Sequence, residues 1–223
     1  MCYSPEADVM AGLVIGAVGV DALRHSDDKR TYALAAVPVV LATHQLIEAV
    51  AWWGLQDRVP PGIGEMAVTI YLIIAFGLVP ALVPYAVMAS EPLRRRRLLM
   101  APFVAMGAVV AVALLYGLAA EPYGASIGGR FIAYEVVTPG GGMTVALYGL
   151  AVCCPLLLSS ARRLVIFGCV NIPVLVGLSV LISAGLISLW CIWAAFSSLL
   201  IAREIRARSP VRSDRRHRLA ESG

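Results

Sequence analysis

The chain has 223 residues, of which 60% are hydrophobic and 14% are charged, and its formal net charge is +4. Soluble domains average roughly 45–50% apolar and about 25% charged residues, so this composition excludes an ordinary soluble protein. Its long unbroken apolar runs also exclude a membrane β-barrel, whose strands alternate apolar and polar residues. The sequence therefore predicts an all-α membrane protein.

The apolar runs fit seven transmembrane helices, since a helix needs about 20 residues to cross the hydrocarbon core of a bilayer. The last run is almost twice as long as one span, and the small residues at Ser183–Gly185 divide it into a sixth and a seventh helix. An arrangement of six spans, with the first segment peripheral, is the alternative. The expected spans are Ala7–Leu23, Thr31–Leu55, Ile63–Met88, Leu98–Leu118, Met143–Leu158 and, for the last two, Leu164–Ala202.

These spans form one predicted domain over residues 1–204, and an arginine-rich tail that we expect to be disordered follows at residues 205–223. Basic residues set the predicted orientation, because cytoplasmic loops of membrane proteins carry an excess of Lys and Arg. With the N-terminus outside and the C-terminus in the cytoplasm, every basic residue except Arg58 and Arg130 lies on the cytoplasmic side. We interpret the arginine clusters as this topology signal, and we exclude nucleic acid as a partner.

A long connection, about Ala119–Gly142, joins the fourth and fifth spans on the predicted outer side. Within it, Ile127–Val137 combines a Gly-Gly pair with β-branched and aromatic residues, which indicates a small hairpin or another structured cap. A disordered loop is the alternative, since connections of this length are either functional or unstructured. We expect a structured external loop.

Polar residues interrupt the second span. His44, Glu48 and Trp52 recur every four residues, and Gln45 precedes Glu48 by three, so a helix presents all four on one stripe. Ionisable groups inside a membrane segment usually face the bundle interior and have a partner or a function. Two interpretations stay open for His44 and Glu48, which either ligate a metal together or satisfy each other and neighbouring hydroxyl groups structurally.

The predicted orientation brings further polar residues close to the depth of Glu48, about 10 Å below the outer end of its span at a rise of about 1.5 Å per residue. They come from the outer ends of the first and third spans, from the outer connection and from the seventh span. We therefore expect a polar pocket in the outer half of the bundle. The ligand-binding candidates are Gln45, Glu48, Trp52, Glu65, Tyr134 and Trp190.

Two cysteines add candidate chemistry to this pocket. Cys2 becomes the first residue if the initiator Met is removed, which places an amine and a thiol together as a metal ligand, a nucleophile or an inert terminus. Cys191 is either a second thiol or a small apolar residue. Glu48 is the deep carboxylate that would act as general base for a thiol. The catalytic candidates are Cys2, Glu48 and Cys191, and the metal-ligand candidates are Cys2, His44 and Glu48.

Several familiar membrane functions lack the residues that they require. A retinal Schiff base needs a lysine inside a span, and the only lysine, Lys29, lies in a predicted loop. Haem ligation by two histidines within the bundle fails because only His44 lies well inside a span. The P-loop, GxSxG and HExxH motifs do not occur.

Three motifs carry a family resemblance: Met1–Ala7, the set of Gln45, Glu48 and either Trp52 or Trp53, and Ser188–Ala195. The chain resembles a family of small bacterial multi-span membrane proteins of unknown function. Its members begin Met-Cys-Phe-Ser, carry a Gln–Glu–Trp motif in the second span, and have Ser-x-Trp-Cys-x-x-Ala-Ala in the last. The resemblance implies the bacterial cytoplasmic (inner) membrane and picks out Cys2, Glu48, Trp190 and Cys191, but it supplies no activity. Relatives often have Gln at the position of His44, which shifts the emphasis to Glu48.

The leading hypothesis is a membrane protein of the seven-helix kind that binds or senses a small ligand or metal ion in an outward-facing polar pocket. A membrane-embedded thiol- or metal-dependent enzyme is the alternative, and a proton-coupled small-molecule transporter is the third, since a membrane glutamate is a natural proton carrier. A transition metal is the cofactor that the candidate ligands would suit. The expected partners are the lipid bilayer and a small molecule or metal ion, with self-association left open.

Overall fold

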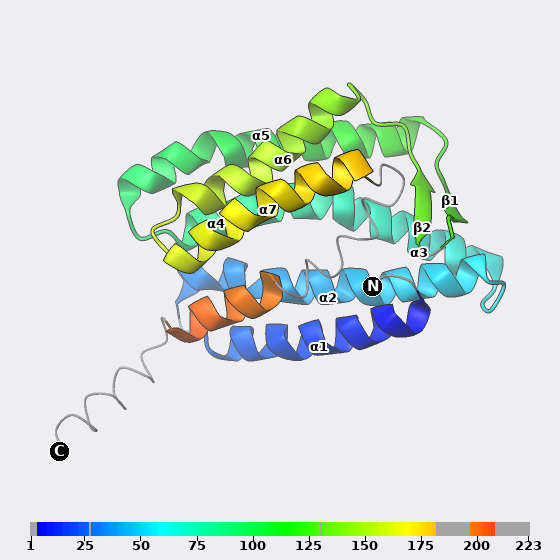
Figure 1. Cartoon of the computed structure of the whole chain (residues 1–223), viewed down its shortest axis with the longest axis horizontal. Helices are drawn as coiled ribbons and strands as arrows, with labels where there is room; N and C mark the ends of the chain where they lie inside the picture. Colours follow the sequence, from blue (N-terminus) through cyan, green and yellow to red (C-terminus); the bar gives the residue numbers. More distant parts are fainter. Residues whose placement is uncertain (1–3, 27, 130, 182–196, 208–223) are drawn as a thin grey trace, which may run out of the picture.

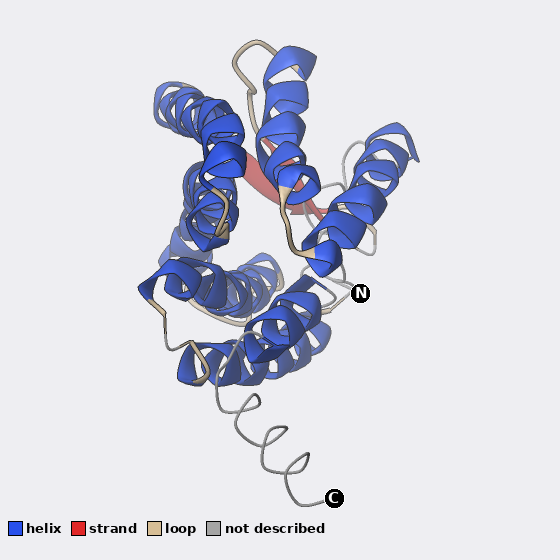
Figure 2. Ribbon diagram, turned by 90° about the vertical axis from the view of Figure 1, so that its left-hand side faces the viewer, coloured by secondary structure: helices blue, strands red, loops and turns tan. Residues whose placement is uncertain are grey.

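A computed structural model describes residues 4–26, 28–129, 131–181 and 197–207 of the chain, and it is mostly helical (Figure 1). The helices lie roughly along one long axis, and a two-stranded hairpin lies across one end (Figure 2). Residues 197–207 are also helical. The elements are α1 (Pro5–Arg24), α2 (Lys29–Leu55), α3 (Pro61–Ile73), the π-helical turn η1 (Ile74–Leu78), α4 (Val79–Ser90), α5 (Arg94–Ala120), β1 (Gly124–Ile127), β2 (Ile132–Glu135), α6 (Gly142–Leu158) and α7 (Arg162–Leu181).

Three helical stretches are long and apolar enough to cross a membrane, namely α2, the continuous stretch from α3 through η1 to α4, and α5. α6 is a shorter apolar helix. The prediction of a helical protein with long apolar helices is therefore confirmed. The predicted break at Ser183–Gly185, which separates the sixth and seventh spans, lies outside the described residues.

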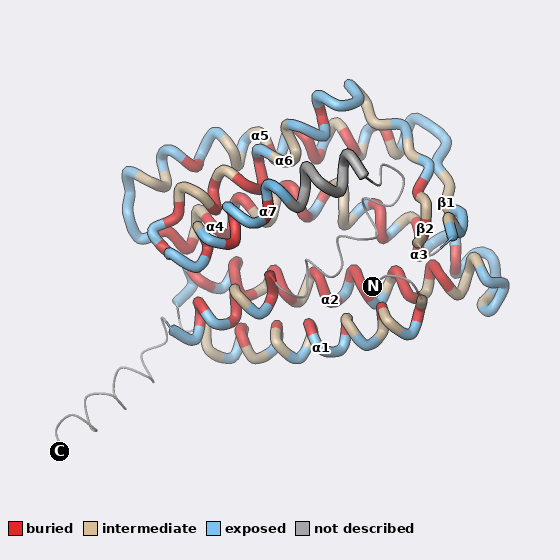
Figure 3. Tube along the Cα trace, viewed as in Figure 1, coloured by how far each residue is buried: buried red, intermediate tan, exposed pale blue. Residues whose placement is uncertain are grey.

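The first two helices pack closely in antiparallel orientation because glycines leave room between them. A Cβ atom on Gly12 would lie 2.7 Å from Leu46 Cδ2 and 3.3 Å from the carbonyl oxygen of Ala42, and one on Gly19 would lie 2.9 Å from the backbone nitrogen of Val39. At the start of α1, the Ser4 side chain accepts a hydrogen bond from the N–H of Ala7, which caps the helix. Buried residues then recur along α2 from Thr31 to Trp52 (Figure 3), because this helix packs against α1 on one side and against α3 and α4 on the other.

The π-helical turn follows from a proline. Pro80 has no N–H to donate, and the N–H of Val79 bonds to the carbonyl of Ile74, five residues earlier. The carbonyl of Ala75 thereby loses both of its candidate backbone donors. The hydroxyl of Tyr148, from α6, donates to that carbonyl at 3.0 Å and satisfies it.

The long connection between α5 and α6 contains the predicted hairpin. β1 and β2 pair antiparallel with Gly124 opposite Glu135 and Ile127 opposite Ile132. Ile132 and Tyr134 are buried in an apolar cluster with residues of α2 and α3, so the hairpin is anchored to the bundle. The prediction of a structured loop is confirmed, although the first strand begins three residues before the stretch that composition singled out.

At the opposite end of the molecule, polar contacts join the loops. Glu91, completely buried between α4 and α5, accepts hydrogen bonds from the backbone N–H of Ser160 at 2.7 Å and of Leu93 at 3.2 Å. Arg96 donates to the carbonyls of Leu158 at 3.1 Å and Ser159 at 2.7 Å, where α6 ends. These contacts fix the turn between α6 and α7 against the turn between α4 and α5.

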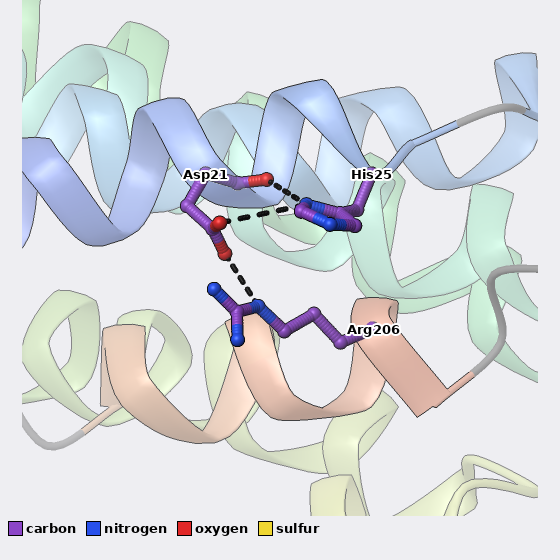
Figure 4. A network of polar contacts seen from close by, with 3 residues as sticks. All are labelled: Asp21, His25 and Arg206. Carbon is purple, nitrogen blue, oxygen red and sulfur yellow. Dashed lines mark hydrogen bonds and ion pairs between the residues drawn. The ribbon is translucent and has the colours of Figure 1, made fainter. Parts of the chain in front are cut away.

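Helical residues 197–207 return to the same end and include residues 205–207, which the sequence analysis assigns to the tail. Arg206 donates to the carboxylate of Asp21 at 2.6 Å, and His25 Nδ1 lies 3.5 Å from the same carboxylate (Figure 4). This hydrogen bond raises the pKa of the Arg206 guanidinium above its usual value. A second ion pair, Arg163 with Glu204 at 3.2 Å, joins the segment to α7. Residues 208–223 lie outside the described part of the chain.

Candidate functional site

The polar stripe predicted on the second span is buried in the structure. His44, Gln45, Glu48 and Trp52 all lie on α2, and Glu48 is fully inaccessible to solvent. At about 100° per residue the four side chains occupy one arc of the helix, as their spacing predicts. The helix therefore holds a carboxylate, an amide, an imidazole and an indole on its inward side.

Within this stripe, Gln45 and Glu48 contact each other directly. Gln45 Nε2 donates to Glu48 Oε2 at 3.2 Å, one helical turn away. His44 makes a different contact, because its ring stacks on Tyr71 of α3, with the ring centroids 3.8 Å apart and the planes 17° from parallel. The amide of Gln45, which the sequence analysis named as a ligand contact, is thus a direct neighbour of the carboxylate.

The aromatic stack continues from α3 to the hairpin. Tyr71 also stacks on Tyr134 of β2, with centroids 4.7 Å apart and planes 8° from parallel. Three rings from three elements therefore form one column, and its His44 lies one helical turn from Glu48 on α2. Trp52 belongs to the same buried cluster as Tyr71 and Tyr134. Tyr134, predicted from the sequence as a ligand contact, is brought to His44 through Tyr71.

Three polar atoms of the stripe lack a hydrogen-bond partner among the described residues: His44 Nε2, Gln45 Oε1 and Trp52 Nε1. All three belong to buried side chains. Leaving a buried polar group without a hydrogen bond costs about 1–3 kcal/mol, so native proteins rarely do so without a reason. A bound molecule is one such reason.

An open groove of about 790 Å³ adjoins this cluster at the hairpin end. It contains Ala51 and Val68, which also belong to the buried cluster with Trp52 and Tyr71. Glu65, predicted as a ligand contact, is exposed at its rim rather than beside Glu48. The groove is lined by Ala51, Gly54, Leu55, Pro61, Gly62, Gly64, Glu65, Met66, Val68, Thr69, Tyr123, Gly124 and Ala125.

The metal and thiol chemistry predicted from the sequence depends on residues outside the described part. Cys2, Trp190 and Cys191 lie there, so the catalytic set and the three-residue metal set stay predictions. Across residues 4–26, 28–129, 131–181 and 197–207, no three His, Cys, Asp or Glu side chains gather as a metal cluster would require. The described candidates His44 and Glu48 face Tyr71 and Gln45 respectively.

Two residues of this region had no role in the sequence analysis. Tyr71 is fully buried and lies at the centre of the aromatic stack. In the sequence it is one aromatic residue within a long apolar run, which is typical of an ordinary core residue. Asp8 is also buried, and the register of α1 on α2 puts it one turn beyond Gly12, at the level of Glu48. An acidic residue within the first apolar run was the signal that could have identified Asp8.

An exposed ion pair lies at the same end of the molecule. Glu6 lies 3.6 Å from Arg58, and both side chains are more than half exposed. The backbone N–H of Glu6 and the Ser4 hydroxyl hold the pKa of the Glu6 carboxyl below its usual value, so this group stays charged near neutral pH.

The chain belongs to a family of unknown function, DUF6629, whose model matches residues 1–216. Comparison with curated proteins and with solved structures gives no match.

Proposed function

We propose that this chain is a seven-helix protein of the bacterial cytoplasmic membrane whose outer half holds a polar pocket for a small ligand. The N-terminus is outside and the C-terminus is in the cytoplasm. The observation that carries the proposal is the buried stripe on α2, which holds the Glu48 carboxylate and three polar atoms that lack partners among the described residues. A buried polar atom without a hydrogen bond destabilises the fold, and a bound ligand that supplies the missing hydrogen bonds removes this penalty.

The membrane location is supported by the long apolar helices and by what they expose. α5 is long enough to span a bilayer, and it presents large apolar side chains outward, with Val109, Val112 and Tyr116 all about 70% exposed (68%, 69% and 71%). In water these groups would form an unfavourable apolar surface. Lipid tails would cover them without that cost.

The orientation is supported by how charges separate between the two ends of the molecule. The arginine-rich turns before α5 and α7 meet at one end, where residues 203–207 also return, whereas Arg58 lies at the end that carries the hairpin. Cytoplasmic loops carry the excess of basic residues in membrane proteins. The hairpin end, which adjoins the polar stripe, is therefore the outer end.

The chemistry of the stripe favours a small organic ligand. An amide oxygen, an indole N–H, an imidazole nitrogen and aromatic rings are the usual lining of sites for organic molecules, which combine an apolar wall with a few placed polar groups. Metal binding would need a third ligand such as Cys2, and thiol catalysis would need Cys2 or Cys191. Those two functions stay secondary.

Retention of small molecules by the purified protein tests the proposal. Wild type, Glu48→Gln and the control Glu121→Gln are purified in a mild detergent, incubated with the small-molecule extract of cells and washed. Bound organic molecules are identified by mass spectrometry and metals by elemental analysis. We expect a near-stoichiometric ligand on wild type and on Glu121→Gln that is lost from Glu48→Gln. Identical retained sets on all three proteins would overturn the proposal.

A further inference from the structure

The end of the molecule that contains the pocket has a strong negative charge. Its segments, residues 4–12, 44–70 and 119–142, contain seven carboxylates and two arginines, a formal charge of −5. The rest of the chain has a formal charge of +9. An asymmetry of this size attracts cations to the hairpin end and repels anions from it.

The buried residues at this end show the same preference for a cation. Glu48 and Asp8 are both buried at this end, and no Lys or Arg side chain is buried anywhere in the described residues. Gln45 Oε1, which has no partner among the described residues, shares its carbon with the Nε2 atom that contacts Glu48. This acceptor therefore lies beside the carboxylate. A carboxylate and an amide oxygen together accept hydrogen bonds from an N–H-rich cation.

The buried region next to Glu48 on α2 is also aromatic. His44, one helical turn from Glu48, begins the column with Tyr71 and Tyr134, and Trp52 belongs to the same cluster as the two tyrosines. Aromatic faces attract organic cations and also accommodate an apolar body. The two tyrosine faces offer a metal ion no ligand atom, whereas an amine attached to a hydrocarbon or aromatic group would use both the acceptors and the rings.

The groove that adjoins this cluster fits the same class of ligand. The groove at the hairpin end runs from exposed Glu65 and Tyr123 at the surface to Ala51 and Val68, which pack in the cluster with Trp52. Its rim thus offers a carboxylate, and its floor is apolar. A small molecule with one positive charge and an apolar body is complementary to both the acidic rim and the apolar floor.

We propose that the pocket takes a small organic cation, a protonated amine attached to an apolar or aromatic body, with Glu48 and Gln45 as acceptors for its N–H groups. This inference rests on the proposed function and names the class of its ligand. The aromatic column provides the wall against which the apolar body packs.

Three probes of equal size and different charge test the proposal. Benzylamine is cationic near neutral pH, benzyl alcohol is neutral and benzoate is anionic. Each is titrated into purified full-length protein in a neutral detergent, and binding is measured by calorimetry and by the shift of the unfolding midpoint temperature. Benzyl alcohol controls for partition into the micelle. Glu48→Gln is compared with Glu121→Gln, which removes the same charge from an exposed position at the same end.

We expect benzylamine to bind and stabilise wild type and Glu121→Gln, and its affinity for Glu48→Gln to fall about tenfold or more, because a charge-assisted hydrogen bond is lost. Benzyl alcohol and benzoate should have no effect that depends on Glu48. If Glu48→Gln does not purify as a monodisperse protein, Gln45→Leu serves instead, since it removes the acceptor at nearly constant volume.

Two results would contradict the proposal that the ligand is a protonated amine. Stabilisation by benzyl alcohol or benzoate that is lost in Glu48→Gln would mean that the pocket binds a ligand of another charge, so the proposed function would stand without this inference. Equal affinity of benzylamine for wild type and Glu48→Gln, or no binding by any probe, would reject the cation site. The extract experiment would then decide the proposed function separately.

Discussion

Replacing Gly54 by alanine tests the packing on which the pocket depends. The end of α2 crosses the start of α3 at Gly54 and Gly64, and both glycines line the groove. A Cβ atom on Gly54 would lie 2.4 Å from the Cα atom of Gly64, and one on Gly64 would lie 2.6 Å from the Cα atom of Gly54. The obstructing atoms belong to the backbone, so no rotamer change relieves the clash.

The expected cost follows from this geometry. Carbon atoms in good contact are about 3.5–4.0 Å apart, so the two helices must separate by about 1 Å. Overpacking of this kind costs about 1–3 kcal/mol. Alanine is favoured over glycine by up to about 1 kcal/mol inside a helix, which offsets part of that cost. We expect Gly54→Ala and Gly64→Ala each to lower the free energy of unfolding by about 1–2 kcal/mol.

The assay is unfolding of the purified protein by sodium dodecyl sulfate in mixed micelles, followed by circular dichroism. Gly62→Ala is the matched control, because it lies in the same turn of α3 and a Cβ atom there would meet no atom within 4 Å. That control should be neutral or slightly stabilising. Equal stability of Gly54→Ala, Gly62→Ala and wild type would show that the helices do not cross at these glycines.

Three further substitutions should separate buried contacts from exposed ones in the same unfolding assay. Glu91→Ala should cost about 1–3 kcal/mol because it leaves buried N–H groups without an acceptor, and a neutral result would contradict the loop contacts described. Tyr148→Phe should cost about 0.5–1.5 kcal/mol because it leaves the carbonyl of Ala75 in the π-helical turn without a donor, and an unchanged free energy of unfolding would contradict this contact. Asp21→Asn should cost at most about 1 kcal/mol, and less at high salt, because Arg206 is more than half exposed; a large, salt-independent loss would contradict this.

The helices were predictable because an uninterrupted apolar run of about 20 residues rarely forms any structure other than a membrane-spanning helix. The sequence also identified the hairpin from its composition and the stripe on α2 from spacing. It could not identify the π-helical turn, because that turn depends on Pro80 together with a hydroxyl from a distant helix, Tyr148. Contacts between segments far apart in sequence have no local signature.

The same limit explains what the sequence analysis missed in the site. Tyr71 looked like ordinary core, since only the fold brings it between His44 and Tyr134. Glu91 stands near Arg94–Arg97 in the sequence, where polar residues are usually exposed, yet it is completely buried and accepts backbone hydrogen bonds. Glu65 was predicted at the pocket because it starts the third span, but the helix turns it to the exposed rim of the groove.

The central claim is a polar pocket that opens on the outer side of the membrane. Its most direct test is labelling of intact cells with a membrane-impermeant maleimide, using single cysteines placed in a variant whose own five cysteines are replaced by serine or alanine. Glu65→Cys reports the rim of the groove, and Arg94→Cys reports the opposite end. The account predicts that Glu65→Cys is labelled in intact cells and Arg94→Cys only after lysis. Labelling of Arg94→Cys but not Glu65→Cys in intact cells would contradict it.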